Sequence, residues 1–256
     1  MKKYLYIFKT TVIEKLQYIF NLVFDFIWFG LVIFILTSIW RYIYSDAVII
    51  NGYTVSQIIW YALLGEAVWL GSTNRTFSEE ISYDIRSGDI ACKINKPYNY
   101  IFFAFSKYFG GIVFKLVFFV LVSISLGLIF IGPIQNFYIS NLPLLILVYV
   151  LGVSITSAIF IIISLSSFWL EENKSIYWVY NQIIIMLGVK FPLEMLPISL
   201  QPIFKITPIF ACAYGPMRLT VDFSMSIFYQ IITAQILWLL SSICLAIFMY
   251  EKGKKK

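Results

Sequence analysis

The chain has 256 residues, of which 61% are hydrophobic, 19% aromatic and only 12% charged, and its formal net charge is +6. A soluble domain of this size could not keep so much apolar surface away from water, so the composition excludes that class and indicates a membrane protein. The chain contains no histidine, which argues against the usual transition-metal and neutral-pH acid–base sites. The basic balance needs no nucleic-acid partner, because it suits anionic lipid headgroups.

Segment 1–21 carries polar residues along one stripe and apolar residues on another face. Lys3, Thr10, Glu14 and Gln17 belong to the polar stripe. This pattern is typical of a helix that lies in a membrane surface. We therefore expect an N-terminal interfacial helix; a plain leader into the first span is the alternative.

Six apolar stretches follow, each about long enough for a helix to cross the roughly 30 Å hydrocarbon core, although the fifth is short. They are 20–40, 55–74, 108–131, 142–170, 175–188 and 226–250. The sequence thus predicts an all-α membrane protein with six transmembrane helices.

Lysine and arginine are distributed unevenly among the segments between these stretches. If the N-terminus is inside, fourteen of them fall on inside segments and four on outside segments, while Lys115 lies within a span. Cytoplasmic loops are enriched in these residues. The sequence therefore predicts that both termini and loops 75–107 and 170–175 are cytoplasmic, with 41–54, 132–141 and 190–224 outside.

Loop 75–107 is the most polar stretch of the chain. Phe77, Ile81 and Ile85 recur every four residues, opposite the acidic side chains of the same segment. Gly88 ends this helical pattern, and Pro97 opens a second amphipathic piece that leads into the third span. Such a loop suits docking of another protein. An ordinary charged loop is the other interpretation.

Segment 189–223 holds five of the eight prolines, at positions Pro192, Pro197, Pro202, Pro208 and Pro216. Proline breaks regular helix, yet the residues between the prolines stay apolar. Broken backbone at membrane depth is tolerated where protein buries it. We therefore expect short re-entrant helices between the fifth and sixth spans.

Glu66 and Lys115 lie inside the second and third spans, both about 13–15 Å from the loop that joins those spans. Charges at this depth usually face the bundle interior and find partners. We expect a structural Glu66–Lys115 ion pair near the transport path; alternatively, one of the two contacts cargo. Asp25 lies near the start of the first span, within reach of interfacial water.

No catalytic site is visible in the sequence. It lacks a phosphate-binding G-x-x-x-x-G-K-[ST] loop, a G-x-S-x-G elbow and an H-E-x-x-H motif. The three cysteines fall in different topological regions, so they predict no disulfide framework or metal cluster. We therefore expect a chain that is not an enzyme and binds no metal.

The order of these parts resembles the membrane subunit of ABC-2-type exporters, over essentially the whole chain (1–256, as one transmembrane domain). Segment 79–91 and the Lys96-Pro97 pair look like the inner-loop signature of a bacterial six-span branch of that family. Phe191-Pro192 and Gly215-Pro216 are similar to its outer segment.

The resemblance implies a permease in the bacterial plasma membrane that works as a homodimer or with a second permease. Two separate ATPase subunits would bind ATP and Mg, and this chain would bind no cofactor. Hydrophobic or amphipathic cargo would pass between the permeases. An ion-gradient-driven secondary transporter or channel is the alternative, although its expected inverted repeats are not visible. An intramembrane lipid enzyme is a third class, but this sequence shows no nucleophile–base pair that such an enzyme would use.

The resemblance also implies roles for particular residues. ATPase coupling is assigned to Glu79, Glu80, Ile81, Asp84, Ile85, Arg86, Gly88, Asp89, Ile90, Lys93, Lys96 and Pro97. An extracellular gate is assigned to Phe191, Pro192, Pro197, Pro202, Pro208, Gly215 and Pro216.

Overall fold

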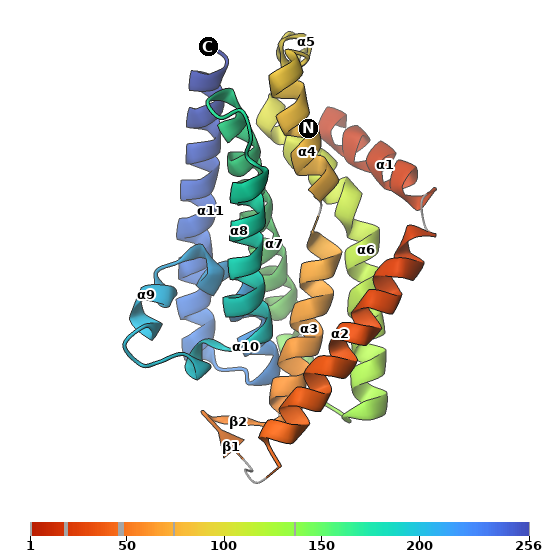
Figure 1. Cartoon of the computed structure of the whole chain (residues 1–256), viewed down its shortest axis with the longest axis vertical. Helices are drawn as coiled ribbons and strands as arrows, with labels where there is room; N and C mark the ends of the chain where they lie inside the picture. The colour runs from red at the N-terminus through yellow and green to blue at the C-terminus, as the bar shows by residue number, and fades with distance from the viewer. Residues whose placement is uncertain (1, 18–19, 46–48, 74, 136, 256) are drawn as a thin grey trace.

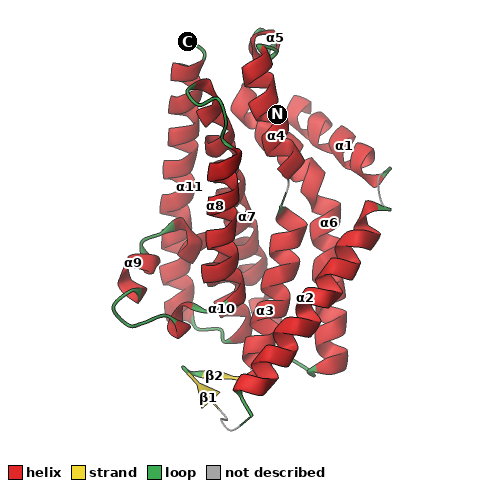
Figure 2. Ribbon diagram, in the orientation of Figure 1, coloured by secondary structure: helices red, strands yellow, loops and turns green. Residues whose placement is uncertain are grey.

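The computed structural model describes residues 2–17, 20–45, 49–73, 75–135 and 137–255. Helices dominate it, and two short antiparallel strands lie at one end (Figure 2). The strands β1 (Ile49–Ile50) and β2 (Tyr53–Thr54) form a hairpin with Ile49 opposite Thr54 and Ile50 opposite Tyr53. The hairpin lies between the first two long helices.

Five long helices make up most of the structure: α2 (Asn21–Ile43), α3 (Val55–Ser72), α6 (Tyr100–Phe130), α7 (Leu142–Leu165) and α11 (Met225–Gly253). Shorter α-helices are α1 (Lys2–Leu16), α4 (Arg75–Ser87), α5 (Ile90–Ile94), α8 (Lys174–Ile184), α9 (Gln201–Lys205) and α10 (Gly215–Val221). Single turns of 3₁₀ helix are η1 (Ile139–Asn141), η2 (Ser166–Phe168) and η4 (Leu193–Met195). Two segments are π-helical, η3 (Ile185–Lys190) and η5 (Phe210–Tyr214).

Within the described residues, four helical stretches are long and apolar enough to cross a membrane: Leu22–Ile43, Tyr100–Phe130, Ile139–Phe168 and Met225–Gly253. They correspond to the first, third, fourth and sixth predicted spans. α3 and the α8–η3 pair occupy the places predicted for the second and fifth. The chain is an all-α membrane protein.

The long helices and α8 lie side by side along the long axis of the molecule (Figure 1). Helices α4 and α5 and both termini lie toward one end, called the inner end below, and the β1–β2 hairpin lies at the opposite, outer end (Figure 1). Helix α1 is inclined beside the inner part of α6 and stands apart from the main bundle (Figure 1).

Local sequence explains where two of these helices begin. Thr54 and Gln57 form a reciprocal capping box at the start of α3. Asn99 caps α6, because its side-chain oxygen accepts hydrogen bonds from the backbone N–H groups of Ile101 and Phe102. Residues 100–107 of the predicted inner loop therefore belong to the continuous helix α6. The predicted end of the second span, Asn74, lies outside the described residues.

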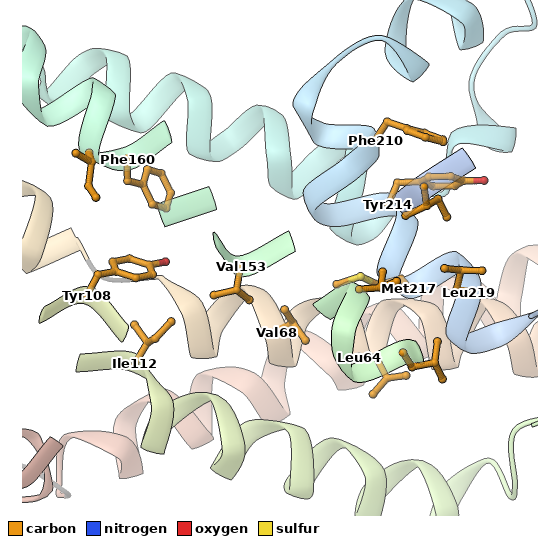
Figure 3. Packing of buried hydrophobic residues seen from close by; sticks show 14 of the residues in the cluster. Leu64, Val68, Tyr108, Ile112, Val153, Phe160, Phe210, Tyr214, Met217 and Leu219 are labelled. Carbon is orange, nitrogen blue, oxygen red and sulfur yellow. The ribbon is translucent and has the colours of Figure 1, made fainter. Parts of the chain in front are cut away.

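Buried side chains from several elements form one large core (Figure 3). Tyr108 of α6, Phe160 of α7 and Met217 of α10 all contribute to it, although they are far apart in the chain. Small residues bring the helices close together: a β-carbon on Gly71 would lie 2.6 Å from the Leu116 Cα, so α3 and α6 pack backbone to backbone. This packing fixes α3 at the centre of the bundle.

Candidate coupling and transport site

Helix α4 at the inner end presents one face to its own chain. Phe77, Ile81 and Asp84 are buried on this face, while Tyr83 on the other side is 63% exposed. The four-residue spacing of the apolar side chains explains why the helix packs in this orientation. α4 therefore buries one face against the bundle and exposes the opposite face, which is called the open face below.

Polar side chains attach α4 to α7 and to the loop that follows it. The Ser78 and Ser164 hydroxyls lie 2.6 Å apart. The Asn173 side-chain N–H donates to Ser82 Oγ at 2.9 Å and to the Ile163 carbonyl at 2.8 Å. These groups are buried, so their hydrogen bonds form away from water. These contacts attach α4 to the inner end of α7.

Two ion pairs extend these attachments to neighbouring elements. Lys107 of α6 pairs with Glu80, and Lys93 of α5 pairs with Asp84. Arg86 donates to the Glu171 carbonyl at 3.2 Å, in the loop before α8. α4 thus contacts α5, α6, α7 and the start of the α8 segment.

One sequence-based interpretation of this loop needs correction. Ile81 and Ile90 are only 4% and 6% exposed and Ile85 packs partly against the same core, so this chain itself covers the side chains expected to anchor a partner. The four-residue spacing of apolar side chains identified the apolar face of α4, but it could not show whether this chain or a partner covers that face. The open face carries Tyr83, which the sequence analysis did not single out.

The remaining predicted residues of the loop lie at its exposed end. Gly88 has a φ of +81°, the left-handed conformation expected where α4 ends. Asp89, Lys96 and Pro97 are exposed. The Pro97 carbonyl accepts a hydrogen bond from Lys3, which ties this end of the loop to α1.

Lys115 forms its ion pair with Asp25 of α2, at 2.7 Å between Nζ and Oδ2. Among the described residues no ion pair joins Lys115 to Glu66, so the predicted Glu66–Lys115 pair is wrong. Equal depth along two helices does not fix the direction in which their side chains point. Lys115 lies on the side of α6 that faces α2, and Asp25 is consequently not limited to interfacial water.

Glu66 lies in the middle of α3 and is only 1% exposed. Its Oε2 atom has no hydrogen-bond partner among the described residues. Lys190, at the end of η3, is the cation whose field acts on this carboxyl group. A buried ionisable side chain inside a span is a candidate functional group, and the described structure gives it no complete structural role.

The two π-helical segments leave backbone carbonyls without their usual helical donors, and other helices supply replacements. The Tyr61 hydroxyl of α3 donates to the Gly188 carbonyl in η3 at 2.5 Å. The Gln235 side chain of α11 donates to the Ala211 carbonyl in η5 at 2.9 Å and to Val148 of α7 at 2.8 Å. Broken backbone is therefore buried and satisfied by protein. Neither donor was predicted from the sequence, although a glutamine in an apolar helix, such as Gln235, is the kind of signal that identifies one.

A polar cluster around Glu194 joins the outer elements. The Tyr53 hydroxyl of β2 and the Tyr214 hydroxyl of η5 donate to its carboxylate at 3.0 and 2.5 Å, and Arg218 Nε lies 3.4 Å away. Burial raises the pKa of the Tyr53 phenol well above its usual range, so this hydroxyl stays protonated as a donor. Arg218 also pairs with Asp222 at 2.8 Å. The cluster fixes the hairpin to η4 and α10.

The predicted gate residues differ in their exposure. Pro197 and Pro202 are exposed, on the outer face of the segment around α9. Gly215 and Pro216 are buried, and a β-carbon on Gly215 would lie 2.7 Å from Ile231 of α11. Phe191 packs edge-on against Trp40 with 5.8 Å between ring centroids. The remaining two, Pro192 and Pro208, are buried and half-buried respectively.

A small cavity lies between α3, α7, α8, η3, η5 and α10. This cavity has a volume of about 20 Å³ and is lined by Trp69, Thr156, Asn181 and Cys212 among others. A volume of this size holds one water molecule, so the cavity is no route for a hydrophobic cargo. Among the described residues no group of three or more histidine, cysteine, aspartate or glutamate side chains forms a candidate metal site.

Comparison with known proteins gives one family. No curated protein matches the chain. A family model described as ABC-2 family transporter protein matches residues 26–256, which include most of α2, the other four long helices, the inner loop and the outer segment. The chain therefore belongs to the ABC-2 family of transporter membrane proteins.

Proposed function

We propose that this chain is the permease subunit of an ATP-driven ABC exporter, and that it forms the path for a hydrophobic or amphipathic cargo together with a second permease. Family membership over residues 26–256 carries this proposal. The cavity of about 20 Å³ at the centre of the bundle is too small for such a cargo, so this cavity does not supply the path.

The proposed topology has six spans, with both termini in the cytoplasm of a bacterial plasma membrane. α3 and α8–η3 serve as the second and fifth spans, and η4, α9, η5 and α10 form the re-entrant segment. The lysine and arginine distribution supports the orientation. The placement of both termini and α4–α5 at one end is consistent with it (Figure 1).

Two separate ATPase subunits, which bind ATP and Mg, power transport in this proposal. The open face of α4, centred on Tyr83, docks on one ATPase. Closure of the ATPases displaces α4, and the Ser78–Ser164 and Asn173 contacts pass that displacement to α7. The segment from Phe191 to Pro216 acts as the outer gate.

Glu66 favours a second candidate, an ion-gradient-driven transporter. A buried carboxyl group with an unpartnered oxygen is what a proton- or cation-coupled carrier needs near its midplane. The family match favours the ATP-driven function. The two candidates differ in their energy source.

The deciding experiment is co-purification of the permease with its cognate ATPase, followed by reconstitution into vesicles. The exporter predicts vanadate-sensitive ATP turnover that rises when the permease is present. Tyr83→Ala should weaken ATPase binding about tenfold or more, as expected of a central aromatic anchor. Tyr42→Ala, which removes an 81% exposed tyrosine at the outer end of α2, is the matched control. Transport driven by a pH gradient without ATP would instead support the second candidate.

Topology is tested separately with single cysteines in a background that lacks the three native ones. Ser87→Cys and Ser199→Cys place a thiol at exposed positions of the inner loop and of the proposed outer segment. An impermeant maleimide added outside intact cells should label only the Ser199 variant. Labelling of both from outside would contradict the six-span orientation.

A further inference from the structure

A groove between α1 and the first turns of α6 is unused by the transport site. It has a volume of about 500 Å³ and is lined by Lys2, Tyr4, Leu5, Phe8, Phe105, Ser106 and Phe109. This volume lies within the range of small-molecule sites. Its walls are almost entirely apolar, and a lysine stands at its edge.

Close packing fixes the shape of this groove. A β-carbon on Gly110 of α6 would lie 2.7 Å from the Phe8 carbonyl, so the backbones of α1 and α6 touch. Thr11 of α1 is buried at the same crossing. Tyr4 packs against Phe102 with 5.9 Å between ring centroids. The groove is therefore held open by contacts on either side of it.

The charge around the groove is positive. Helix α1 carries Lys2, Lys3, Lys9 and Lys15 and a single acidic residue, Glu14. Leu5, beside Lys2, is 70% exposed, so an apolar wall lies next to a cation. A ligand that fits both has an acyl chain and an anionic headgroup.

We propose that the groove binds one anionic phospholipid of the inner leaflet. An acyl chain lies along Leu5, Phe8, Phe105 and Phe109, and the phosphate lies beside Lys2. The inference relies on the proposed topology, in which α1 lies at the cytoplasmic surface, but not on export or on an ATPase.

Two residues of α1 at the groove form hydrogen bonds to the inner loop. The Tyr4 hydroxyl, which lines the groove, accepts a hydrogen bond from the Asn99 backbone N–H at 2.9 Å. Lys3 donates to the Pro97 carbonyl. A bound lipid consequently stabilises the position of α1 against the segment between α5 and α6.

The test is native mass spectrometry of the detergent-purified full-length chain with equal concentrations of dioleoyl phosphatidylglycerol or phosphatidylcholine. We expect one retained phosphatidylglycerol and weaker retention of phosphatidylcholine. Lys2→Gln should lower phosphatidylglycerol retention on the order of fivefold, the effect of one lysine near an anionic group. Lys15→Gln, on the same helix but away from the groove, is the control.

A second pair of variants tests the apolar wall. Ser106→Trp fills the groove, whereas Ser125→Trp places the same side chain at an exposed serine further along α6; both serine hydroxyls bond only their own helix in the described contacts. Only Ser106→Trp should reduce phosphatidylglycerol retention. Free glycerol phosphate should not displace the lipid.

Three results would overturn the proposal: equal retention of the two lipids, equal loss in the Lys2 and Lys15 variants, or full displacement by glycerol phosphate. None of these readouts measures ATP turnover or transport. Their failure would therefore leave the proposed exporter function untouched, and failure of ATPase stimulation would leave the lipid site untouched.

Discussion

The inner helix α4 and the outer segment 191–221 satisfy their polar groups in opposite ways. α4 is a regular helix, and side chains link it to α5, α6 and α7, as Ser78 with Ser164. The outer segment is broken into 3₁₀, α and π turns, and the Ala211 carbonyl in its π-helical part η5 accepts a hydrogen bond from Gln235 of α11. Neighbouring side chains therefore hold α4 in place, whereas the backbone of the outer segment itself needs donors from other helices.

The largest expected effect is in the outer segment. Gln235→Leu removes the donor to Ala211 and Val148 and should lower the free energy of unfolding by roughly 2–4 kcal/mol, because two buried carbonyls lose a partner. Thermal unfolding in detergent measures this. Thr233→Val is the control, since that exposed hydroxyl bonds within its own helix at 2.8 Å to Tyr229. Equal melting temperatures for the two variants would contradict the role given to Gln235.

The next effect concerns the Asp25–Lys115 ion pair, which joins α2 to α6. Asp25→Asn or Lys115→Met alone should cost about 1–3 kcal/mol, less than full insertion of a charge because the side chains are 36% and 24% exposed. The double variant should recover much of that loss. A cycle of Glu66→Gln with Lys115→Met should instead be additive within about 0.3–0.5 kcal/mol. Strong coupling in the second cycle would restore the pair that the structure excludes.

These two cases show what the sequence could and could not predict. Hydropathy and length located the helices, because burial in lipid needs a long apolar run. The depth of Lys115 followed from its position in the run. The partner of Lys115 did not follow from that position. Successive side chains point about 100° apart around a helix, and packing against α2 decides which side of α6 faces α2. The sequence therefore led to the wrong prediction that Glu66 pairs with Lys115, while Asp25 was placed near interfacial water.

The same limit applies to both ends of the molecule. Periodicity in the inner loop separated Ile81 from Tyr83, yet it could not tell whether this chain or a partner covers Ile81. Prolines predicted a broken outer segment, since proline removes a donor and fixes φ. The positions of the π turns, at Ile185–Lys190 and Phe210–Tyr214, depend on donors from α3 and α11 that only the folded bundle brings together.

A smaller effect on stability is expected at the inner end. Asn173→Ala removes the donor to Ser82 and Ile163 and should cost about 1–2 kcal/mol. If α4 transmits movement to α7, this variant should lose most ATPase stimulation while it remains folded. Asn95→Ala, at an exposed position after α5, is the control. Unchanged stimulation in a folded Asn173 variant would mean that α4 and α7 are coupled in another way.

The smallest expected effect distinguishes two adjacent carboxylates of α4. Glu79 pairs with Arg75 within the helix at 2.8 Å, with side chains 46% and 61% exposed, so Glu79→Gln should change stability by only about 0.3–0.5 kcal/mol. Glu80 pairs with Lys107 across to α6, and Glu80→Gln should cost up to about 1 kcal/mol. A double-mutant cycle with Lys107→Met isolates that link, and ATPase stimulation should fall for Glu80→Gln more than for Glu79→Gln. Equal stimulation in both variants would show that α4 moves without its contact to α6. Side chains attach α4 to its neighbours. The Glu80–Lys107 ion pair can therefore contribute little to folding stability and still be required if movement of α4 is to displace α6.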